Sequence, residues 1–346
     1  GLCPQPRHVQ FTEGRFPLPT VLSWAGPDEV TDAVTTLAER LAPALDVVRV
    51  TSHTDTISLI VTVNPALEAE GYRIEIDTQI RITAGDPNGA RWAVQTLLQL
   101  LPPWVHGPGP LAREHLHLPK GVIVDAPHYS WRGAHLDVSR HFMPASFITR
   151  FLDVLAMHKL NRLHLHLTDD QGWRLPVPGW PRLTTVGAWR PGTVRGHQPP
   201  PDDNDCDDVA EHDHVPHGGA YTVEQLSAIN KRAGLLGITV VPEIDLPGHT
   251  ESVVAAYPAL GCGIPLDHPR TAFGVSEHHI NLTDDSLAFS RDALDTVMEV
   301  FPNSPIHIGG DECPGNEWFG HEPTRTRLAK LGITTPHQAQ AWFERQ

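Results

Sequence analysis

Three short segments in the first third of the chain carry the hydrophobic pattern of β-strands. The first is rich in β-branched residues, and in the next two the apolar side chains recur at every second position; the segments are residues 57–63, 72–76 and 79–84. A period of two predicts strands with one buried face. A turn at 85–89 leads into an apolar stretch at 90–101, which predicts a helix, and a last strand is expected near 116–124. Residues 1–125 are therefore interpreted as a small α/β domain.

From Trp131 onward, strand-like and helix-like segments alternate. Helical spacing of apolar residues predicts a helix at 147–158. A capping box at Thr222 and Gln225 begins another that runs to about 236, and Asp284-Asp285 opens a third that runs to about 301. Strands are expected between these helices, at residues 133–138, 162–167, 238–244 and 305–312. This alternation predicts βα units around a parallel sheet.

Each of these later strands ends in polar and charged residues. They are Asp137–His141, Asp169-Asp170, Glu243–His249 and Asp311-Glu312. In a (β/α)8 TIM barrel the chemistry is located at the carboxyl ends of the strands. No Gly-rich dinucleotide motif follows a strand and no phosphate-binding P-loop motif occurs, so a Rossmann-type sheet is disfavoured. The predicted fold class is α/β, with a TIM-barrel domain at 126–346 preceded by a small α+β domain at 1–125.

Composition narrows the classes of protein to consider. Lys and Arg number 26 against 41 Asp and Glu, for a net charge of −15, which argues against a nucleic-acid binder. No apolar stretch reaches the length of a membrane span. The four cysteines include no CxxC pair, which disfavours a zinc ribbon or redox motif and leaves a single disulfide open.

The pair Asp311-Glu312, directly after Gly309-Gly310, is the sharpest chemical signal. Adjacent carboxyl groups with different surroundings can hold different pKa values, so that one donates a proton while the other stays charged. Strand alternation would point the two side chains apart, and the glycines permit a distortion that brings both to one site. The alternative interpretation is a solvated acidic turn.

Other strand ends supply further candidates. Arg140 could hold hydroxyl groups with its planar fork or make a structural ion pair. Asp169 could orient a histidine, and Trp173 could pack at the cleft or in the core. Asp245 and His249 lie four residues apart across a Pro-Gly turn, where a carboxylate would raise the pKa of the histidine.

Two histidine pairs raise the question of a metal. His164 and His166 form an HxH pattern on one face of a predicted strand, where filling of the barrel interior is favoured over metal binding. His212 and His214 lie in an acidic, Pro-rich loop and suggest at most a weak adventitious site. No metal and no other cofactor is expected.

Four motifs together resemble one enzyme family. They are Trp131–Phe142, His158–Arg174, Val241–His249 and His307–Glu312. Their order, spacing and strand-end placement are similar to those of the β-N-acetylhexosaminidases of glycoside hydrolase family 20. The resemblance is strong over 131–346, and residues 1–125 resemble the small domain that precedes the barrel in that family.

The resemblance implies a retaining exo-β-N-acetylhexosaminidase that releases terminal β-linked GlcNAc or GalNAc from oligosaccharides or glycoconjugates. Catalysis is substrate-assisted in this family: the acetamido oxygen of the substrate attacks the anomeric carbon and forms an oxazolinium. By match, Glu312 is the general acid and base and Asp311 holds the acetamido N–H. Arg140 binds the 3- and 4-hydroxyls, and a dyad of Asp169 and His249 supports Glu312. The site residues carried over are Glu312, Asp311, His249 and Asp169 for catalysis, and Arg140, Asp245 and Trp173 for substrate binding.

Only four strands are recognisable after residue 126, whereas a complete barrel has eight. We therefore expect the natural protein to be longer, and these 346 residues alone to be unstable or inactive. A disaccharide-releasing relative of the lacto-N-biosidase type, a metal-dependent amidohydrolase-type barrel using the HxH pair, and a non-catalytic sugar-binding module stay open. The acidic balance and low lysine content favour a secreted enzyme, and a cytoplasmic one stays open, as do sugar preference and oligomeric state.

Overall fold

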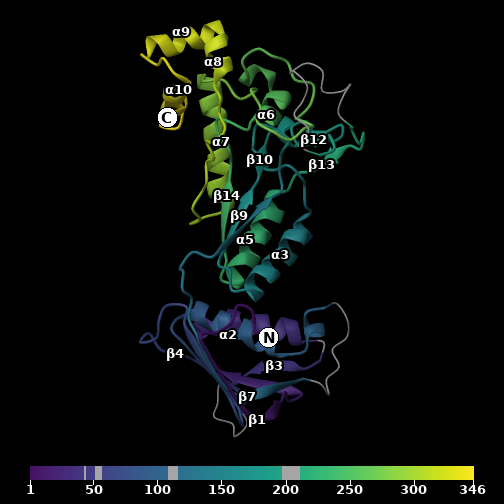
Figure 1. Ribbon diagram of the computed structural model, residues 1–346, viewed down its shortest axis with the longest axis vertical. Coiled ribbons are helices and arrows are strands. Elements are labelled where there is room, and N and C mark those ends of the chain that lie inside the picture. The colour runs from purple at the N-terminus through teal and green to yellow at the C-terminus, as the bar shows by residue number, and fades with distance from the viewer. Residues whose placement is uncertain (43, 51–56, 108–115, 197–210) are drawn as a thin grey trace. The chain divides into compact units, whose positions relative to one another are not determined.

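A computed structural model describes residues 1–42, 44–50, 57–107, 116–196 and 211–346, which form two compact units (Figure 1). Unit 1 comprises Gly1–Ala134 with two later segments, Thr149–Arg162 and Lys231–Thr239. Unit 2 comprises His135–Ile148, Leu163–Asn230 and Val240–Gln346. The division between domains at residues 125 and 126 stays a sequence-based prediction.

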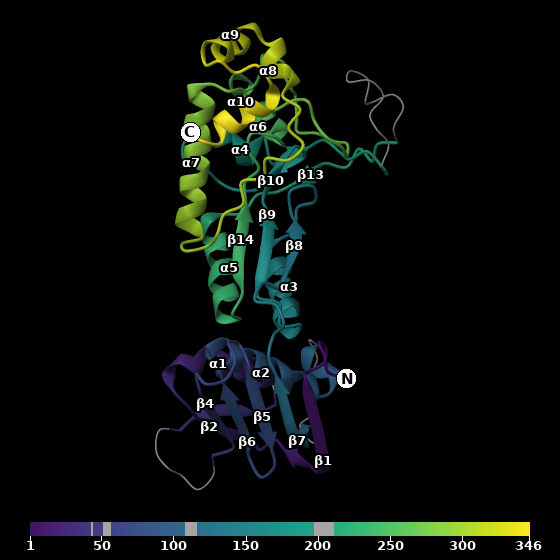
Figure 2. The ribbon, with the colours of Figure 1, turned by 60° about the vertical axis from the view of Figure 1, so that its left-hand side comes forward.

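Unit 1 is built on a seven-stranded sheet with the order β1-β7-β5-β6-β4-β2-β3. Strands β2, β3, β4 and β6 pair in parallel, whereas β5, β7 and β1 pair antiparallel with their neighbours. The strands are β1 (His8–Pro17), β2 (Val21–Ala25), β3 (Asp46–Arg49), β4 (Leu59–Val63), β5 (Tyr72–Ile76), β6 (Ile80–Ala84) and β7 (His117–Asp125). Helices α1 (Thr31–Leu41) and α2 (Pro87–Leu100) lie side by side against one face of this sheet (Figure 2).

The hydrophobic pattern explains these elements. In β5 and β6 every second residue is buried, as the period of two predicted. Helix α2 begins after Asp86, whose side chain accepts the backbone N–H of Gly89, and the fixed backbone of Pro87 suits its first turn. The sequence interpretation missed β1, β2, β3 and α1. Most of β1 is exposed, so its side chains show no regular alternation of buried and exposed positions.

The later part of the chain contributes a three-stranded sheet in the order β14-β9-β8, in which all strands run in the same direction (Figure 2). These strands are β8 (Gly133–Asp137), β9 (Arg162–His166) and β14 (Thr239–Glu243). Helices α3 (Ala145–Met157) and α5 (Val223–Leu235) connect them. The predicted βα alternation is therefore confirmed, and so is the capping box: the Thr222 N–H donates to Gln225 Oε1 at 2.9 Å and the Gln225 N–H to Thr222 Oγ1 at 3.2 Å.

The fourth predicted strand differs from expectation. Residues 307 and 308 pair in parallel with β14 and the residues after it, through a bridge between Glu243 and His307 and three backbone hydrogen bonds of 3.0 Å, and the pairing ends where Gly309 and Gly310 take left-handed backbone angles. Within the described residues the strands form an open sheet and not a closed barrel.

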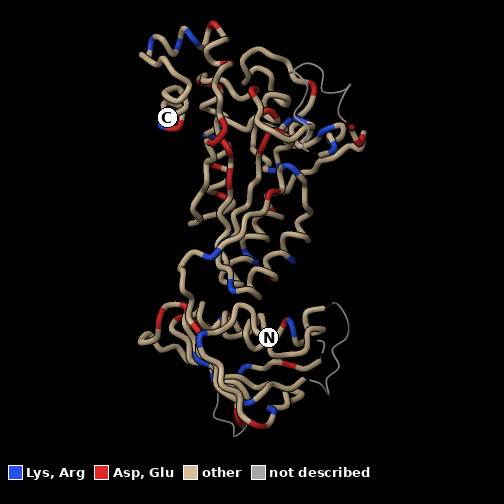
Figure 3. Tube along the Cα trace, in the orientation of Figure 1, with Lys and Arg blue, Asp and Glu red and all other residues tan. Residues whose placement is uncertain are grey.

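The later part of the chain contains further elements. They are β10 (Thr168–Asp169), β11 (Gly172–Trp173), α4 (Arg182–Thr185), β12 (Trp189–Arg190), β13 (His217–Gly218), α6 (Glu251–Ala256), α7 (Asp284–Val300), α8 (Asn316–Gly320), α9 (Glu322–Lys330) and α10 (Pro336–Phe343). Acidic residues recur along α7 (Figure 3). None of the described helices combines the length and hydrophobicity needed to cross a bilayer. Cys3, Cys262 and Cys313 are free thiols, and Cys206 lies outside the described residues, as does most of the acidic loop at 199–217.

Candidate active site

The carboxyl ends of β8 and β9 bring Arg140 and Asp169 together in unit 2. Nη2 of Arg140 lies 2.7 Å from Asp169 Oδ2, and its Nη1 lies 3.0 Å from Asp137 Oδ2. Asp169 is fully buried, yet its pKa stays well below the ordinary value. Burial opposes the charge, but hydrogen bonds from His166 and His249 and the nearby guanidinium outweigh it. The guanidinium is thus held in one orientation with its side chain about a third exposed.

His249 follows β14 and links the buried carboxylates to Glu312. Its Nδ1 lies 3.1 Å from Asp170 Oδ2 and 3.3 Å from Asp169 Oδ1, and its Nε2 lies 3.5 Å from Glu312 Oε2. Burial opposes protonation of this ring, but the two carboxylates outweigh it and raise the pKa to about 11. A charged imidazolium therefore faces the Glu312 carboxylate. Nε2 of His249 makes no hydrogen bond among the described residues, and catalytic contacts of this length often shorten into hydrogen bonds only when substrate binds.

The Gly309-Gly310 turn brings the Asp311-Glu312 pair against Asp245. Oδ1 of Asp245 accepts the N–H of Gly310 at 2.9 Å, and a Cβ on Gly309 would lie 1.9 Å from that same oxygen. One ligand atom each of Asp245, His249 and Asp311 lies within 4.8 Å of the others. Only glycine fits this close approach, so the turn is what places both carboxylates at the end of β14.

Glu312 and Asp245 occupy different surroundings. The Glu312 side chain is 55% exposed, and its backbone takes a left-handed φ of 48°, a strained conformation that is common at functional sites. Asp245 is buried, and burial raises its pKa to about 7, against the opposing hydrogen bond from Gly310. The strained backbone holds the Glu312 carboxyl group at the surface, where a substrate can reach it.

Trp173 does not lie where a substrate could touch it. The side chain is fully buried, its indole N–H donates to the Leu175 carbonyl at 2.6 Å, and its ring packs against Phe289 with the centroids 5.5 Å apart. The expected substrate contact is therefore corrected to a core position. Strand β11 pairs with β10 and turns this side chain inward.

Sequence reasoning passed over Asp170, the nearer acceptor for His249, and the partnership of His166 with Glu243. Asp170 is fully buried and also accepts the Glu251 N–H at 3.1 Å. His166 lies between carboxylates: Nε2 is 2.7 Å from Asp169 Oδ2, and Nδ1 is 2.7 Å from Glu243 Oε2. The HxH alternation predicted that His166 points inward, but the pattern does not indicate which carboxylate contacts it.

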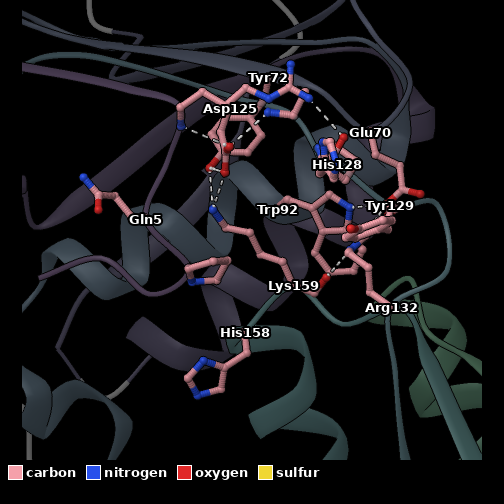
Figure 4. A pocket seen from close by; sticks show the side chains of 14 residues that line it. Gln5, Glu70, Tyr72, Trp92, Asp125, His128, Tyr129, Arg132, His158 and Lys159 are labelled. Atoms are coloured by element: carbon pink, nitrogen blue, oxygen red, sulfur yellow. Dashed lines mark hydrogen bonds and ion pairs between the residues drawn. The ribbon is translucent and has the colours of Figure 1, made fainter.

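A cavity of about 390 Å³ lies in unit 1 and is lined by aromatic, charged and proline residues (Figure 4). Its charged groups already pair with one another. Lys159 Nζ lies 2.8 Å from Asp125 Oδ2, and Arg132 Nη2 lies 2.5 Å from Glu70 Oε2, whose oxygen also accepts the Trp92 indole N–H at 2.7 Å. These groups stabilise unit 1, and the strand-end site in unit 2 is the stronger candidate for chemistry.

Comparison with known families identifies the protein family of this chain. Residues 129–346 match the catalytic domain of glycosyl hydrolase family 20, and residues 1–126 match domain 2 of that family. The chain belongs to glycosyl hydrolase family 20. The family resemblance expected from the four motifs is thereby confirmed, and the family's catalytic fold is a TIM barrel with an N-terminal domain before it.

Curated relatives of this family 20 chain carry hexosaminidase names. A "Beta-hexosaminidase" of Porphyromonas gingivalis is 36% identical over 282 residues, which cover 81% of this chain and 34% of the relative. A "Beta-hexosaminidase" of Vibrio furnissii is 31% identical over 351 residues, covering 98% of this chain and 53% of the relative. The chain thus spans from about a third to about half the length of these relatives.

Solved structures of family 20 enzymes are also similar to this chain. A family 20 exo-β-N-acetylglucosaminidase from Vibrio harveyi, in complex with N-acetylglucosamine, matches 99% of this chain and 51% of its own, with a TM-score of 0.80 and 29% identity. An N-acetyl-β-hexosaminidase from Streptomyces plicatus matches 96% of this chain and 64% of its own, with a TM-score of 0.75 and 31% identity.

Proposed function

We propose that this protein is a retaining exo-β-N-acetylhexosaminidase that releases terminal β-linked GlcNAc or GalNAc from oligosaccharides or glycoconjugates. The observation that carries the proposal is the position of His249, which faces Asp169 and Asp170 with one ring nitrogen and Glu312 with the other. Membership of family 20 and the hexosaminidase names of its relatives support the same activity.

The proposed reaction has two steps and uses the acetamido group of the substrate as nucleophile. In the first, Glu312 donates its proton to the glycosidic oxygen, the bond from that oxygen to the anomeric carbon breaks, and the acetamido oxygen bonds to the anomeric carbon. The departing sugar leaves as an alcohol and an oxazolinium remains. In the second, Glu312 takes a proton from water, whose oxygen replaces the acetamido oxygen with net retention.

Other side chains hold the substrate and its developing charge. Asp311, one residue before the acid, would accept the acetamido N–H and offset the positive charge of the oxazolinium. The Arg140 guanidinium, fixed by Asp137 and Asp169, would donate to the 3- and 4-hydroxyls of the terminal sugar. The imidazolium of His249 orients Glu312 and assists its return to the ionised form.

The test compares two chromogenic substrates with the full-length natural protein. Hydrolysis of p-nitrophenyl N-acetyl-β-glucosaminide should far exceed hydrolysis of p-nitrophenyl β-glucoside, which lacks the acetamido group. Glu312→Gln should abolish the first activity because the amide cannot donate a proton. Glu299→Gln, at an exposed position of α7, is the matched control and should retain full activity.

Each alternative outcome identifies a different error. Equal cleavage of both substrates would show that the protein supplies its own nucleophile. Activity lost to a chelator would favour the metal-dependent barrel, and cleavage of neither substrate by a folded protein would favour a disaccharide-releasing or binding function.

A further inference from the structure

A further buried carboxyl group, that of Glu251, lies beside the acid–base residues, and the proposed reaction gives it no role. Glu251 is the first residue of α6, two positions after His249, and its side chain is 8% exposed. Its N–H donates to Asp170 Oδ1 at 3.1 Å, while the other oxygen of Asp170 lies 3.1 Å from His249 Nδ1. The backbone of Glu251 therefore holds the carboxylate that faces the imidazolium.

The Glu251 side chain connects this arrangement to segment 270–276. Its Oε2 accepts the hydroxyl of the buried Ser276 at 2.5 Å and lies 3.5 Å from Nη1 of Arg270. The backbone N–H of Arg270 in turn donates to the Asp170 carbonyl at 3.0 Å. These contacts close a ring of Asp170, Glu251 and Arg270, so Glu251 is held by both its backbone and its side chain.

The charged groups that face Glu251 decide which carboxyl group keeps its proton. They are Asp170, Arg270 and His278. Burial raises the pKa of both carboxyl groups, and hydrogen bonding to His249 opposes this at Asp170. Arg270 approaches Glu251 only to 3.5 Å, so burial and the charge of Asp170 raise the pKa of Glu251 to about 7. Asp170 therefore keeps its charge, and Glu251 holds a proton under acidic conditions.

The other elements packed against α6 add no charge at Glu251. Strand β11 and residues 258–260 contain no titratable side chain. Helix α4 contributes Arg182, whose guanidinium lies over the ring of Tyr257, beyond the far end of α6. His278 lies 2.7 Å from Glu317 Oε1, which partly offsets its charge when the ring is protonated.

We propose that Glu251 is a positioning residue for the acid–base pair, which holds His249 against Glu312 through Asp170 and segment 270–276. The inference rests on the proposed glycosidase function. Glu251 acts through Asp170 and His249 and not on the substrate itself. When Glu251 ionises, it adds a negative charge beside this pair, and a like charge disfavours loss of the Glu312 proton. Glu251 therefore keeps the acid protonated to a higher pH.

The test is the pH dependence of kcat/KM on p-nitrophenyl N-acetyl-β-glucosaminide, measured with the full-length natural protein and its variants. The alkaline limb of this profile reports proton loss from Glu312 in the free enzyme. Glu251→Gln carries no charge at any pH, so its alkaline limb should move to lower pH by about 0.5 pH unit. The matched control is Glu277→Gln, which removes the same charge from an exposed position one residue after Ser276 and should keep the natural profile.

Two further variants separate the contacts of Glu251 from its charge. Under acidic conditions, where Glu251 is already uncharged, Glu251→Gln should match the natural kcat. Glu251→Ala loses the contacts with Ser276 and Arg270 and should lower kcat about 10-fold at every pH, with KM nearly unchanged. Ser276→Ala removes a hydrogen bond that lowers the pKa of Glu251, so its alkaline limb should lie between those of the natural protein and Glu251→Gln.

A natural kcat in Glu251→Ala, or an unchanged alkaline limb in Glu251→Gln, would overturn the inference. If circular dichroism shows that Glu251→Ala does not fold, Glu251→Gln and Ser276→Ala still decide the question, because each changes only one polar group. Absence of hydrolysis by the folded natural protein would overturn the proposed function itself, and this inference with it.

Discussion

The charge of a single buried carboxyl group, Asp245, should be visible in the stability of the whole fold. Its side chain is almost fully buried, and burial raises its pKa to about 7 in the folded state. An unfolded aspartate releases its proton near about pH 3.9. Between these values the folded state binds more protons than the unfolded state, so Asp245 makes stability decrease as the pH rises from about 4 to 7.

We expect Asp245→Asn to remove this pH dependence. The amide keeps the oxygen that accepts the Gly310 N–H and carries no charge, so the variant should equal the natural protein near pH 4 and exceed it at pH 8. A shift from the reference value to about 7 corresponds to up to about 4 kcal/mol at about 1.4 kcal/mol per pH unit. Urea unfolding at both pH values measures it, with the exposed Asp295→Asn as control. Parallel pH curves for Asp245→Asn and the natural protein would contradict the argument.

Asp169 and Asp170 both contact His249, but their other partners predict different kinetic effects. Asp169 also holds Arg140, the expected sugar ligand, whereas the side chain of Asp170 otherwise accepts only the Glu251 N–H among the contacts described. Asp170→Asn should therefore lower kcat by about 100-fold, the scale of general acid–base assistance, with KM nearly unchanged. Asp169→Asn should lower kcat and also raise KM.

Steady-state kinetics on the chromogenic N-acetylglucosaminide separate these effects. Identical changes in kcat and KM for the two variants would mean that Asp169 does not position Arg140 for substrate.

At the scale of an element, the Gly309-Gly310 turn decides where the Asp311-Glu312 pair lies. Gly309 has a φ of 64°, and a Cβ there would lie 1.9 Å from Asp245 Oδ1. We expect Gly309→Ala to displace Asp245 and to lose most activity. Gly332→Ala is the matched control, because Gly332 has a φ of 73° and a Cβ added there would meet no atom within 4 Å.

Both alanine variants carry the same backbone strain, about 1–2 kcal/mol for a left-handed residue. Only the first carries the steric clash with Asp245. Thermal unfolding and activity of the two variants therefore separate strain from displacement, and full activity of Gly309→Ala would show that the turn does not position the site.

At the scale of the molecule, a buried ion pair ties segment 149–162 to the seven-stranded sheet within unit 1. Lys159 Nζ contacts Asp125 Oδ2 at 2.8 Å and the Tyr72 hydroxyl at 2.7 Å. Burial lowers the pKa of Lys159, which the pairing with Asp125 opposes. The ion pair with Asp125 therefore favours the charged form of Lys159, which burial disfavours.

Lys159→Met should destabilise the fold by about 3–5 kcal/mol, because it leaves Asp125 buried without a counter-charge. The double variant Lys159→Met/Asp125→Asn should recover much of this loss. Chemical denaturation of the single and double variants measures both values. If the double variant is as unstable as Lys159→Met, the loss comes from packing and not from the unpaired carboxylate.

Much of the fold could be predicted from local pattern. The alternation in β5 and β6, the capping box before α5 and the βα order of the later chain all follow from neighbouring residues, and the structure confirms them. The largely exposed β1 could not be predicted, because its pairing with β7 over a hundred residues away defines it. The parallel pairing expected at 305–312 is present only at residues 307 and 308, because positive φ angles at Gly309 and Gly310 end the extended backbone there.

The sequence by itself determined the family and the types of side chain at the strand ends, because the order and spacing of the motifs can be read without knowing which residues are in contact. Only the tertiary structure decided which groups meet. It assigned Asp170 to His249 and Glu243 to His166. It also showed that Trp173 lies in the core and not in the cleft. Charge states at the site depend on burial and on partners brought from distant strands, and one-dimensional spacing contains neither quantity.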